Sequence, residues 1–345
     1  MRTEILKRLE QIPGNISFFY ENLVTGEVIG YKEQEPLMAA SVIKLFIMTA
    51  VFERLEREEI SKECISKEEV SKKEVSKEAV RNIDISRWDN SKGNTSESDI
   101  KNEDNGKKNI SREGTLGAGV SGAGISKAEI GKAEIGNESF SAEKVFSIRR
   151  EDCVPSCGAL TYLHDGIQVT VMDLVTLMII FSDNTATNVL IELLGIEEIN
   201  ATIKKLGFEK TILRRKMFDL EKSRNGIQNY IAAGEVGRLL KMMYEGNLIS
   251  RKASEKMISI MKNQQLASKI PFYLKAIPDG PEIAHKTGED RGITHDVGII
   301  YGKKPFVVCF CGNETDTPQF ERLMADISLE LYQELNGENT RISES

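Results

Sequence analysis

The segment Ser41-Val42-Ile43-Lys44 introduces a strongly apolar run that continues to Val51. Such a run predicts a buried helix over residues 41–51, with Ser41 at its start. Three positions make most of one helical turn, so the Ser41 and Lys44 side chains are expected to face the same way. Burial lowers a lysine pKa, and a neutral lysine can take a proton from a serine. Ser-x-x-Lys alone is also compatible with a capping serine and a lysine that reaches solvent.

Two further polar motifs follow. Ser182-Asp183-Asn184 separates two apolar helical runs, 170–181 and 185–194, which predicts a loop whose polar side chains point toward another part of the molecule or a ligand. A simple helix cap would have the same composition. His285-Lys286-Thr287-Gly288 fits a strand edge that a ligand approaches closely, although a surface turn is the alternative.

The rest of the chain predicts a mixed α/β fold of the α+β kind. Strand patterns at both ends enclose a helical middle, so one antiparallel sheet made from both termini and covered by helices is expected. The predicted helices are residues 2–11, 230–244 and 317–335, and the predicted strands are 15–20, 27–31, 296–301 and 306–311.

Residues 61–140 differ in composition from their surroundings. Residues 61–80 form four pentads of the type Ser-Lys-Glu-Glu-Val, and the theme returns at 126–135. A period of five matches neither a strand nor one helix face, and the segment is too polar to bury a core. We therefore predict a catalytic domain of residues 1–60 and 141–345, with 61–140 a low-complexity, mostly disordered insertion. A partner-binding arm is the alternative.

Composition excludes several other classes. The 345 residues carry a formal net charge of -7 and no long basic run, so a nucleic-acid partner is not expected. No apolar stretch is long enough for a membrane span, and residues 1–9 do not resemble a signal peptide. We expect a cytoplasmic protein, or a secreted one whose leader has been removed. A monomer is expected.

The five cysteines do not form a metal site. Cys64, Cys153, Cys157, Cys309 and Cys311 have no zinc-ligand spacing with histidine, and buried reduced thiols are the expected state of the last two. No metal or organic cofactor is expected.

The three motifs together resemble one family. Ser-x-x-Lys, Ser-Asp-Asn and Lys-Thr-Gly in this order are the signature set of class A β-lactamases and penicillin-binding proteins. The resemblance covers residues 1–60 and 141–345 and implies a β-lactamase/transpeptidase-like fold. Ser182 and Lys286 are 104 residues apart (286 minus 182), similar to the family interval. The interval from Ser41 to Ser182 is longer by about the size of the insertion.

The resemblance also implies roles for individual residues. Ser41 attacks an activated amide carbonyl and becomes acylated, and Lys44 takes or relays its proton. Ser182 passes a proton to the leaving nitrogen. Asn184 hydrogen-bonds the acyl side chain and helps to hold Lys44. The chemistry agrees, because a hydroxyl is a poor nucleophile at neutral pH and needs a base.

The strand motif is implied to bind the substrate carboxylate through Lys286 and Thr287, followed by Gly288. The backbone N–H groups of Ser41 and Glu289 are implied to form the oxyanion hole, which needs two aimed donors.

His295 is expected to bind substrate as well. It occupies the region where many class A enzymes have a carboxylate-binding arginine, and Arg291 is the nearest arginine. A neutral His295 packed beside Asp296 is the structural alternative.

The family's deacylating glutamate has no obvious counterpart. Arg214 and Asn229 are 15 apart (229 minus 214), which resembles the Arg–Asp clasp of the loop that carries that glutamate. On this alignment Lys216 occupies the glutamate position. We predict Asp219 as the stand-in base, in preference to Glu221, which is expected to be a solvated charge.

Three functions remain open. The first is a β-lactam hydrolase. The second is a D,D-peptidase-like acyl-transferase or penicillin-binding protein with slow deacylation, acting on D-Ala-D-Ala-like peptides. The third is a non-catalytic binding or scaffold protein, against which the intact Ser41, Lys44, Ser182 and Lys286 set argues.

Overall fold

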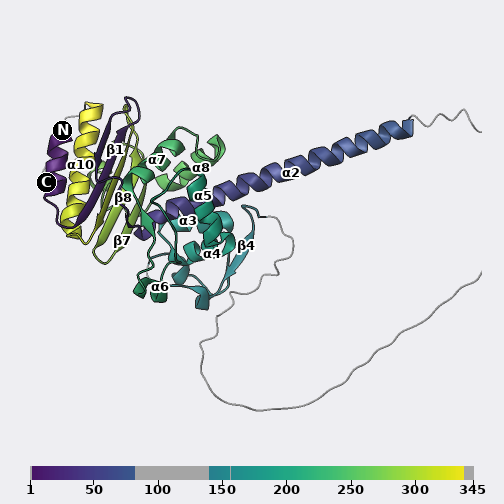
Figure 1. The fold of residues 1–345 in the computed structure, drawn as a ribbon, viewed down its shortest axis with the longest axis horizontal. Coiled ribbons are helices and arrows are strands. Elements are labelled where there is room, and N and C mark those ends of the chain that lie inside the picture. The colour runs from purple at the N-terminus through teal and green to yellow at the C-terminus, as the bar shows by residue number, and fades with distance from the viewer. Residues whose placement is uncertain (1, 82–139, 156, 338–345) are drawn as a thin grey trace, which may run out of the picture. The chain divides into compact units, whose positions relative to one another are not determined.

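The computed structural model describes residues 2–81, 140–155 and 157–337, and for residues 63–81 it describes the helical backbone alone. The chain divides into two compact units, Met1–Lys62 with Glu138–Ser345 and Glu63–Asn137. The first unit contains the sheet (Figure 1), and its residue ranges include all three motifs.

A five-stranded antiparallel sheet forms the centre of the first unit. Its strand order is β2-β1-β9-β8-β7, so the N-terminal hairpin pairs with the C-terminal strands as the sequence predicts. Phe18 of β1 lies opposite Phe310 of β9, and Lys286 of β7 lies opposite Val297 of β8. The strands are β1 (Asn15–Asn22), β2 (Val28–Tyr31), β7 (Ile283–Asp290), β8 (Ile293–Ile300) and β9 (Phe306–Asn313).

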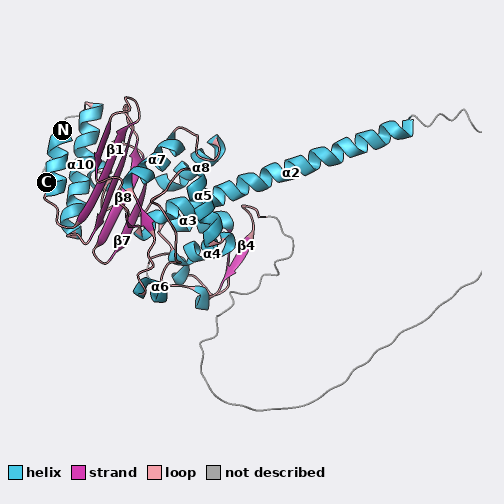
Figure 2. Cartoon of the chain, viewed as in Figure 1, coloured by secondary structure: helices cyan, strands magenta, loops and turns pink. Residues whose placement is uncertain are grey.

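Helices cover both faces of this sheet (Figure 2). On one face lie α1 (Arg2–Glu10), α9 (Pro271–Leu274) and α10 (Thr317–Asn336), packed around Phe18, Phe310 and Phe320. The Arg8 guanidinium of α1 donates to the Glu330 carboxylate of α10 at 2.8 and 2.7 Å, so helices from opposite ends of the chain are tied together.

The helical region lies on the other face of the sheet. Its core surrounds the first turns of α2 (Lys44–Arg81), because Leu45, Phe46, Ile47 and Met48 are all fully buried. The other helices of this region are α3 (Val171–Ile180), α4 (Asn184–Leu194), α5 (Ile196–Lys205), α6 (Leu220–Arg224), α7 (Ala233–Tyr244) and α8 (Arg251–Lys262). Two small sheets pair β3 (Leu37–Met38) with β6 (Tyr230–Ile231) and β4 (Val145–Ile148) with β5 (Ile167–Thr170).

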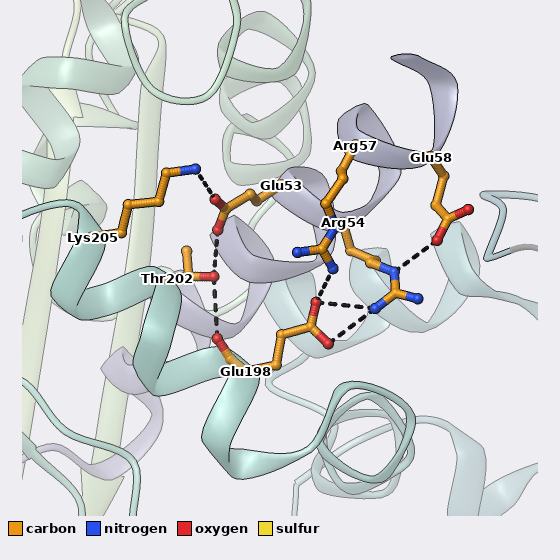
Figure 3. Close-up of polar contacts among 7 residues, drawn as sticks. All are labelled: Glu53, Arg54, Arg57, Glu58, Glu198, Thr202 and Lys205. Atoms are coloured by element: carbon orange, nitrogen blue, oxygen red, sulfur yellow. Dashed lines mark hydrogen bonds and ion pairs between the residues drawn. The ribbon is translucent and has the colours of Figure 1, made fainter. Parts of the chain in front are cut away.

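Charged side chains join α2 to α5 (Figure 3). Glu198 of α5 accepts from Arg54 and Arg57 of α2, while Glu53 of α2 accepts from Lys205 at 2.5 Å and from the Thr202 hydroxyl. These pairs fix the α2 segment that follows Lys44. They involve only the face of α5 that contains Glu198, Thr202 and Lys205.

The division between the two units falls after Lys62, next to the predicted domain boundary at residue 60. The helix that begins at Lys44 nevertheless continues to Arg81, so this part of the segment expected to be disordered is helical, because Lys, Glu and Ala in the pentads favour helix. Residues 82–139 lie outside the described residues. Tyr230 belongs to strand β6 and not to a helix, because it pairs with Met38, so α7 begins only at Ala233. None of the helices among the described residues combines the length and the apolar character that crossing a bilayer requires.

Candidate active site

A cavity of about 670 Å³ lies where the segment before α2, strand β7 and residues 215–229 meet. Three of the predicted site residues, Ser41, Asn184 and Glu289, line this cavity. Lys44, Ser182, Lys286 and Thr287 are at most 3% exposed and lie behind the lining. No group of three His, Cys, Asp or Glu side chains among the described residues is placed to hold a metal ion.

Ser41 lies in a short 3₁₀ turn, Ala40–Ile43, that precedes α2. The expectation that Ser41 begins the α-helix is therefore wrong by one turn, and Lys44 is the first α-helical residue. Ala40 has φ +41°, a strained conformation for a residue with a Cβ. Within the described part of the chain the Ser41 hydroxyl has no hydrogen-bond partner, and it lines the cavity. The hydroxyl is therefore available to an incoming carbonyl.

Lys44 is fully buried behind Ser41. Its Nζ donates to the Ser182 carbonyl at 2.7 Å, to Asn184 Oδ1 at 2.8 Å and to the Ser182 hydroxyl at 3.1 Å. Burial, with the nearby Lys286 cation, lowers the pKa of Lys44 well below its ordinary value. A lysine with a lowered pKa has the property that a general base requires.

Ser182 links the two lysines. It lies between α3 and α4 with φ +56°, and its hydroxyl accepts from Lys44 Nζ and Lys286 Nζ, each at 3.1 Å. Backbone strain of this kind is found where a function fixes a side chain. The geometry connects both amines through one hydroxyl, which is the arrangement of a proton relay.

Asp183, the middle residue of the triplet, is structural. Its carboxylate accepts from Ala186 N at 2.9 Å and so caps α4. The same carboxylate accepts from Ala159 N at 2.7 Å and Leu160 N at 2.9 Å, which holds the loop that contains Cys157 against the cavity. The cap was foreseeable from the sequence, whereas the contact with residues 159 and 160 was not.

Strand β7 brings Lys286 to the site. Lys286 is fully buried, and its Nζ also donates to the Thr287 carbonyl at 2.8 Å. Burial lowers the pKa of Lys286 to about 7, against the raising effect of Asp296. A Cβ on Gly288 would lie 3.3 Å from Ser41 N and 3.1 Å from Val42 Cγ2, so glycine lets β7 approach Ser41 this closely.

His295 is not among the residues that line the cavity, and its substrate-binding role stays a prediction. It is fully buried on β8, and Gly312 N donates to its Nδ1 at 3.1 Å. Its Nε2 lies 2.8 Å from the Met38 carbonyl, so Nε2 is the protonated nitrogen. Burial lowers the pKa of His295 to about 4, which keeps the ring neutral. Asp296 Oδ1 lies 3.0 Å from His285 Nδ1, so Asp296 pairs with His285 and not with His295.

Lys269 is a buried cation that the motif analysis did not identify. It is 0% exposed, and its Nζ lies 2.5 Å from Glu289 Oε1 and 3.8 Å from Glu321 Oε1. Glu289 lines the cavity, so Lys269 holds the side chain of a predicted oxyanion-hole residue. The contact joins positions 20 residues apart. No local motif signals such a contact.

The predicted clasp between Arg214 and Asn229 is present, but it is a side chain-to-backbone contact and not an ion pair. Asn229 Oδ1 accepts from the backbone N–H groups of Arg214 at 2.7 Å and Arg215 at 3.0 Å, so the clasp joins amide to backbone. Asn188 holds Met217 in the same way, accepting from its N–H at 2.8 Å and donating to its carbonyl at 2.9 Å.

The carboxylates of this segment are not among the residues that line the cavity. Asp219 caps α6 by accepting from Lys222 N at 3.0 Å and is not among the cavity-lining residues. Glu221 is exposed and also lies outside the lining. The Lys216 ammonium pairs with Glu192. The structure therefore does not bring the predicted stand-in base Asp219 together with Ser41, because its oxygens serve the helix cap.

Comparison with known proteins gives one family. The family model described as "Beta-lactamase enzyme family" matches residues 1–77 and 133–335. Beta-lactamase ROB-1 of Haemophilus influenzae is 24% identical over 199 residues, which is 56% of this chain and 64% of ROB-1. The chain thus spans less than two thirds of the length of this curated relative.

Solved structures share the fold. A β-lactamase from Sphaerobacter thermophilus has a TM-score of 0.66 at 22% identity, covering 96% of each chain. PBP-A has a TM-score of 0.64 at 18% identity, covering 97% of this chain and 95% of its own. The family match over most of the sequence, the shared fold and the three assembled motifs agree, and the chain belongs to the beta-lactamase enzyme family.

Proposed function

We propose that this protein is a serine hydrolase that opens the β-lactam amide bond through an acyl-enzyme on Ser41. The observation that carries the proposal is the Ser182 hydroxyl held 3.1 Å from both Lys44 Nζ and Lys286 Nζ, behind a cavity that Ser41 lines. This arrangement supplies a nucleophile, a desolvated base and a relay at one place.

The acylation steps follow from these groups. Neutral Lys44 takes the Ser41 proton while the oxygen bonds to the carbonyl carbon. In the proposed mechanism the N–H groups of Ser41 and Glu289 donate to the resulting oxyanion. The amide C–N bond then breaks, and the leaving nitrogen takes its proton from the Ser182 hydroxyl, which lysine Nζ resupplies. Lys286 and Thr287 bind the substrate carboxylate, because a cation and a hydroxyl on one strand match an anion.

Slow release of the acyl group is the second candidate behaviour, and a specific observation favours it. The carboxylates that line the cavity are Glu289 and Asp290 of β7, and none comes from the described residues 214–229. Water attack on an acyl-enzyme needs a base on the side from which water arrives. A penicillin-binding or D,D-peptidase-like protein with a long-lived adduct fits this feature.

One experiment tests the proposal and separates the two behaviours. The protein is mixed with a chromogenic cephalosporin, and both colour and intact mass are followed. Steady colour formation supports hydrolysis, whereas one stoichiometric adduct without turnover supports slow deacylation. Ser41→Ala is expected to abolish colour and adduct, and Ser223→Ala, which alters the same cavity, is expected to keep them. An adduct that survives Ser41→Ala would overturn the proposal.

A further inference from the structure

A second cavity, of about 830 Å³, lies between α5, residues 207–214 and Tyr230. It shares no lining residue with the cavity at Ser41. Its apolar wall contains Ile203, Phe208 and Ile212. The space is therefore large enough for a small organic ligand and independent of the nucleophile.

The charges around this cavity are mainly positive. Lys204, Lys210 and Arg214 line it, against the single acid Glu209. Within the described residues none of these three cations forms an ion pair. The neighbouring Lys205, in contrast, pairs with Glu53 on the opposite side of α5 (Figure 3). Three cations without counter-charges in a chain of net charge -7 indicate a place for an anion.

The cationic wall is held rigidly. Buried Glu235 accepts from the backbone N–H groups of Glu209, Lys210 and Thr211 at 2.7, 2.9 and 2.8 Å, which fixes this loop. Asn200 of α5 bonds both backbone groups of Leu213, at 2.7 and 2.9 Å. A wall fixed before the ligand arrives lowers the entropic cost of binding.

A further feature suits an aromatic anion. The Arg214 guanidinium lies 5.4 Å from the centre of the Tyr230 ring, which orients the cation at the cavity.

We propose that this second cavity binds a small organic anion, with an acidic head group at Lys210 and Arg214 and an aromatic or apolar body against Phe208 and Ile212. The site is independent of acylation at Ser41, so it stands or falls separately from the proposed function.

The test uses 8-anilinonaphthalene-1-sulfonate, an aromatic monoanion, in a fluorescence titration of the full chain. One saturable site is expected, weakened about tenfold by Lys210→Gln or Arg214→Gln, the effect of losing one charge-assisted contact. Arg214→Gln keeps the backbone N–H that Asn229 holds, so folding is not at stake. Glu209→Gln is expected to tighten binding.

Arg291→Gln is the matched control, because Arg291 lines the cavity at Ser41. Its affinity for the probe should equal that of the unmodified protein. Binding that does not saturate, equal affinity in all variants, or weakening by Arg291→Gln alone would each overturn the proposal.

Discussion

The two walls of the active-site cavity are built differently. On one wall the polar side chains meet each other, and Lys44, Ser182, Asn184 and Lys286 form a continuous hydrogen-bonded set behind Ser41. On the facing wall, residues 215–229, Asn229 accepts from the backbone N–H groups of Arg214 and Arg215, and the Arg215 guanidinium donates to Gln228 Oε1. The hydrogen bonds of the first wall position groups that can act on a substrate, whereas those of the second wall fix the conformation of the loop.

Removing the base of the first wall has the largest expected effect. Lys44→Met should slow adduct formation with a penicillin by about 10²–10⁴-fold, the contribution of a general base. The rate is measured by intact mass at several times after mixing. Lys262→Met, which removes a partly buried lysine paired with Glu282 and outside the cavity lining, is the control. An unchanged rate in Lys44→Met would contradict the base assignment.

Adding a base to the second wall should raise turnover. Met217 lines the cavity and its backbone is already held by Asn188, so Met217→Glu places a carboxylate there without moving the chain. We expect release of the acyl group to accelerate by at least about tenfold, part of what a positioned base supplies. The decay of the adduct mass measures this.

Met217→Gln has the same shape without the basicity. If Met217→Gln accelerates release of the acyl group as much as Met217→Glu does, a missing base is not the reason for slow release.

The pH dependence of kcat/KM tests the role of Lys286. The pKa of Lys286 is about 7, so its charge is present below that pH and is lost as pH rises. Because the charged form binds the substrate carboxylate, kcat/KM for an anionic substrate should fall as pH rises through about 7. Lys286→Arg should remove the fall, since a guanidinium stays charged. A fall that persists in Lys286→Arg would assign it to another group.

The smallest effect is expected at Asp219. Asp219→Ala should leave turnover unchanged and cost about 1 kcal/mol of stability, the value of an N-cap. Turnover is measured with a chromogenic cephalosporin and stability by urea unfolding. Glu221→Ala, at an exposed position of the same helix, should change neither. A large loss of turnover in Asp219→Ala would restore it as the base.

The sequence predicted the sheet and the first wall because both are encoded locally. Strand patterns identify β1, β8 and β9, and each motif is a contiguous run whose chemistry is visible in its letters. Burial of Lys44 followed from the apolar residues after it. The family resemblance added the order in which the motifs meet.

The contacts that support the second wall and strand β7 were not predictable in the same way. The contact of Asn188 with Met217 spans 29 positions, and that of Lys269 with Glu289 spans 20. Neither pair has a local pattern. His295 and Asp219 have side chains suited to chemistry, but Gly312, Met38 and the α6 cap occupy their polar atoms, which spacing alone does not reveal.

The Ser182 hydroxyl contacts two amines, Lys44 Nζ and Lys286 Nζ, and the protonation of Lys286 is linked to ligand binding. An anion beside Lys286 favours its charged form, so a site that is largely neutral at pH 8 takes a proton from solvent as the ligand enters. The heat of binding to Ser41→Ala should therefore depend on the ionisation enthalpy of the buffer at pH 8 and lose that dependence at pH 5. Ligand affinity and pH are therefore coupled through the protonation of Lys286.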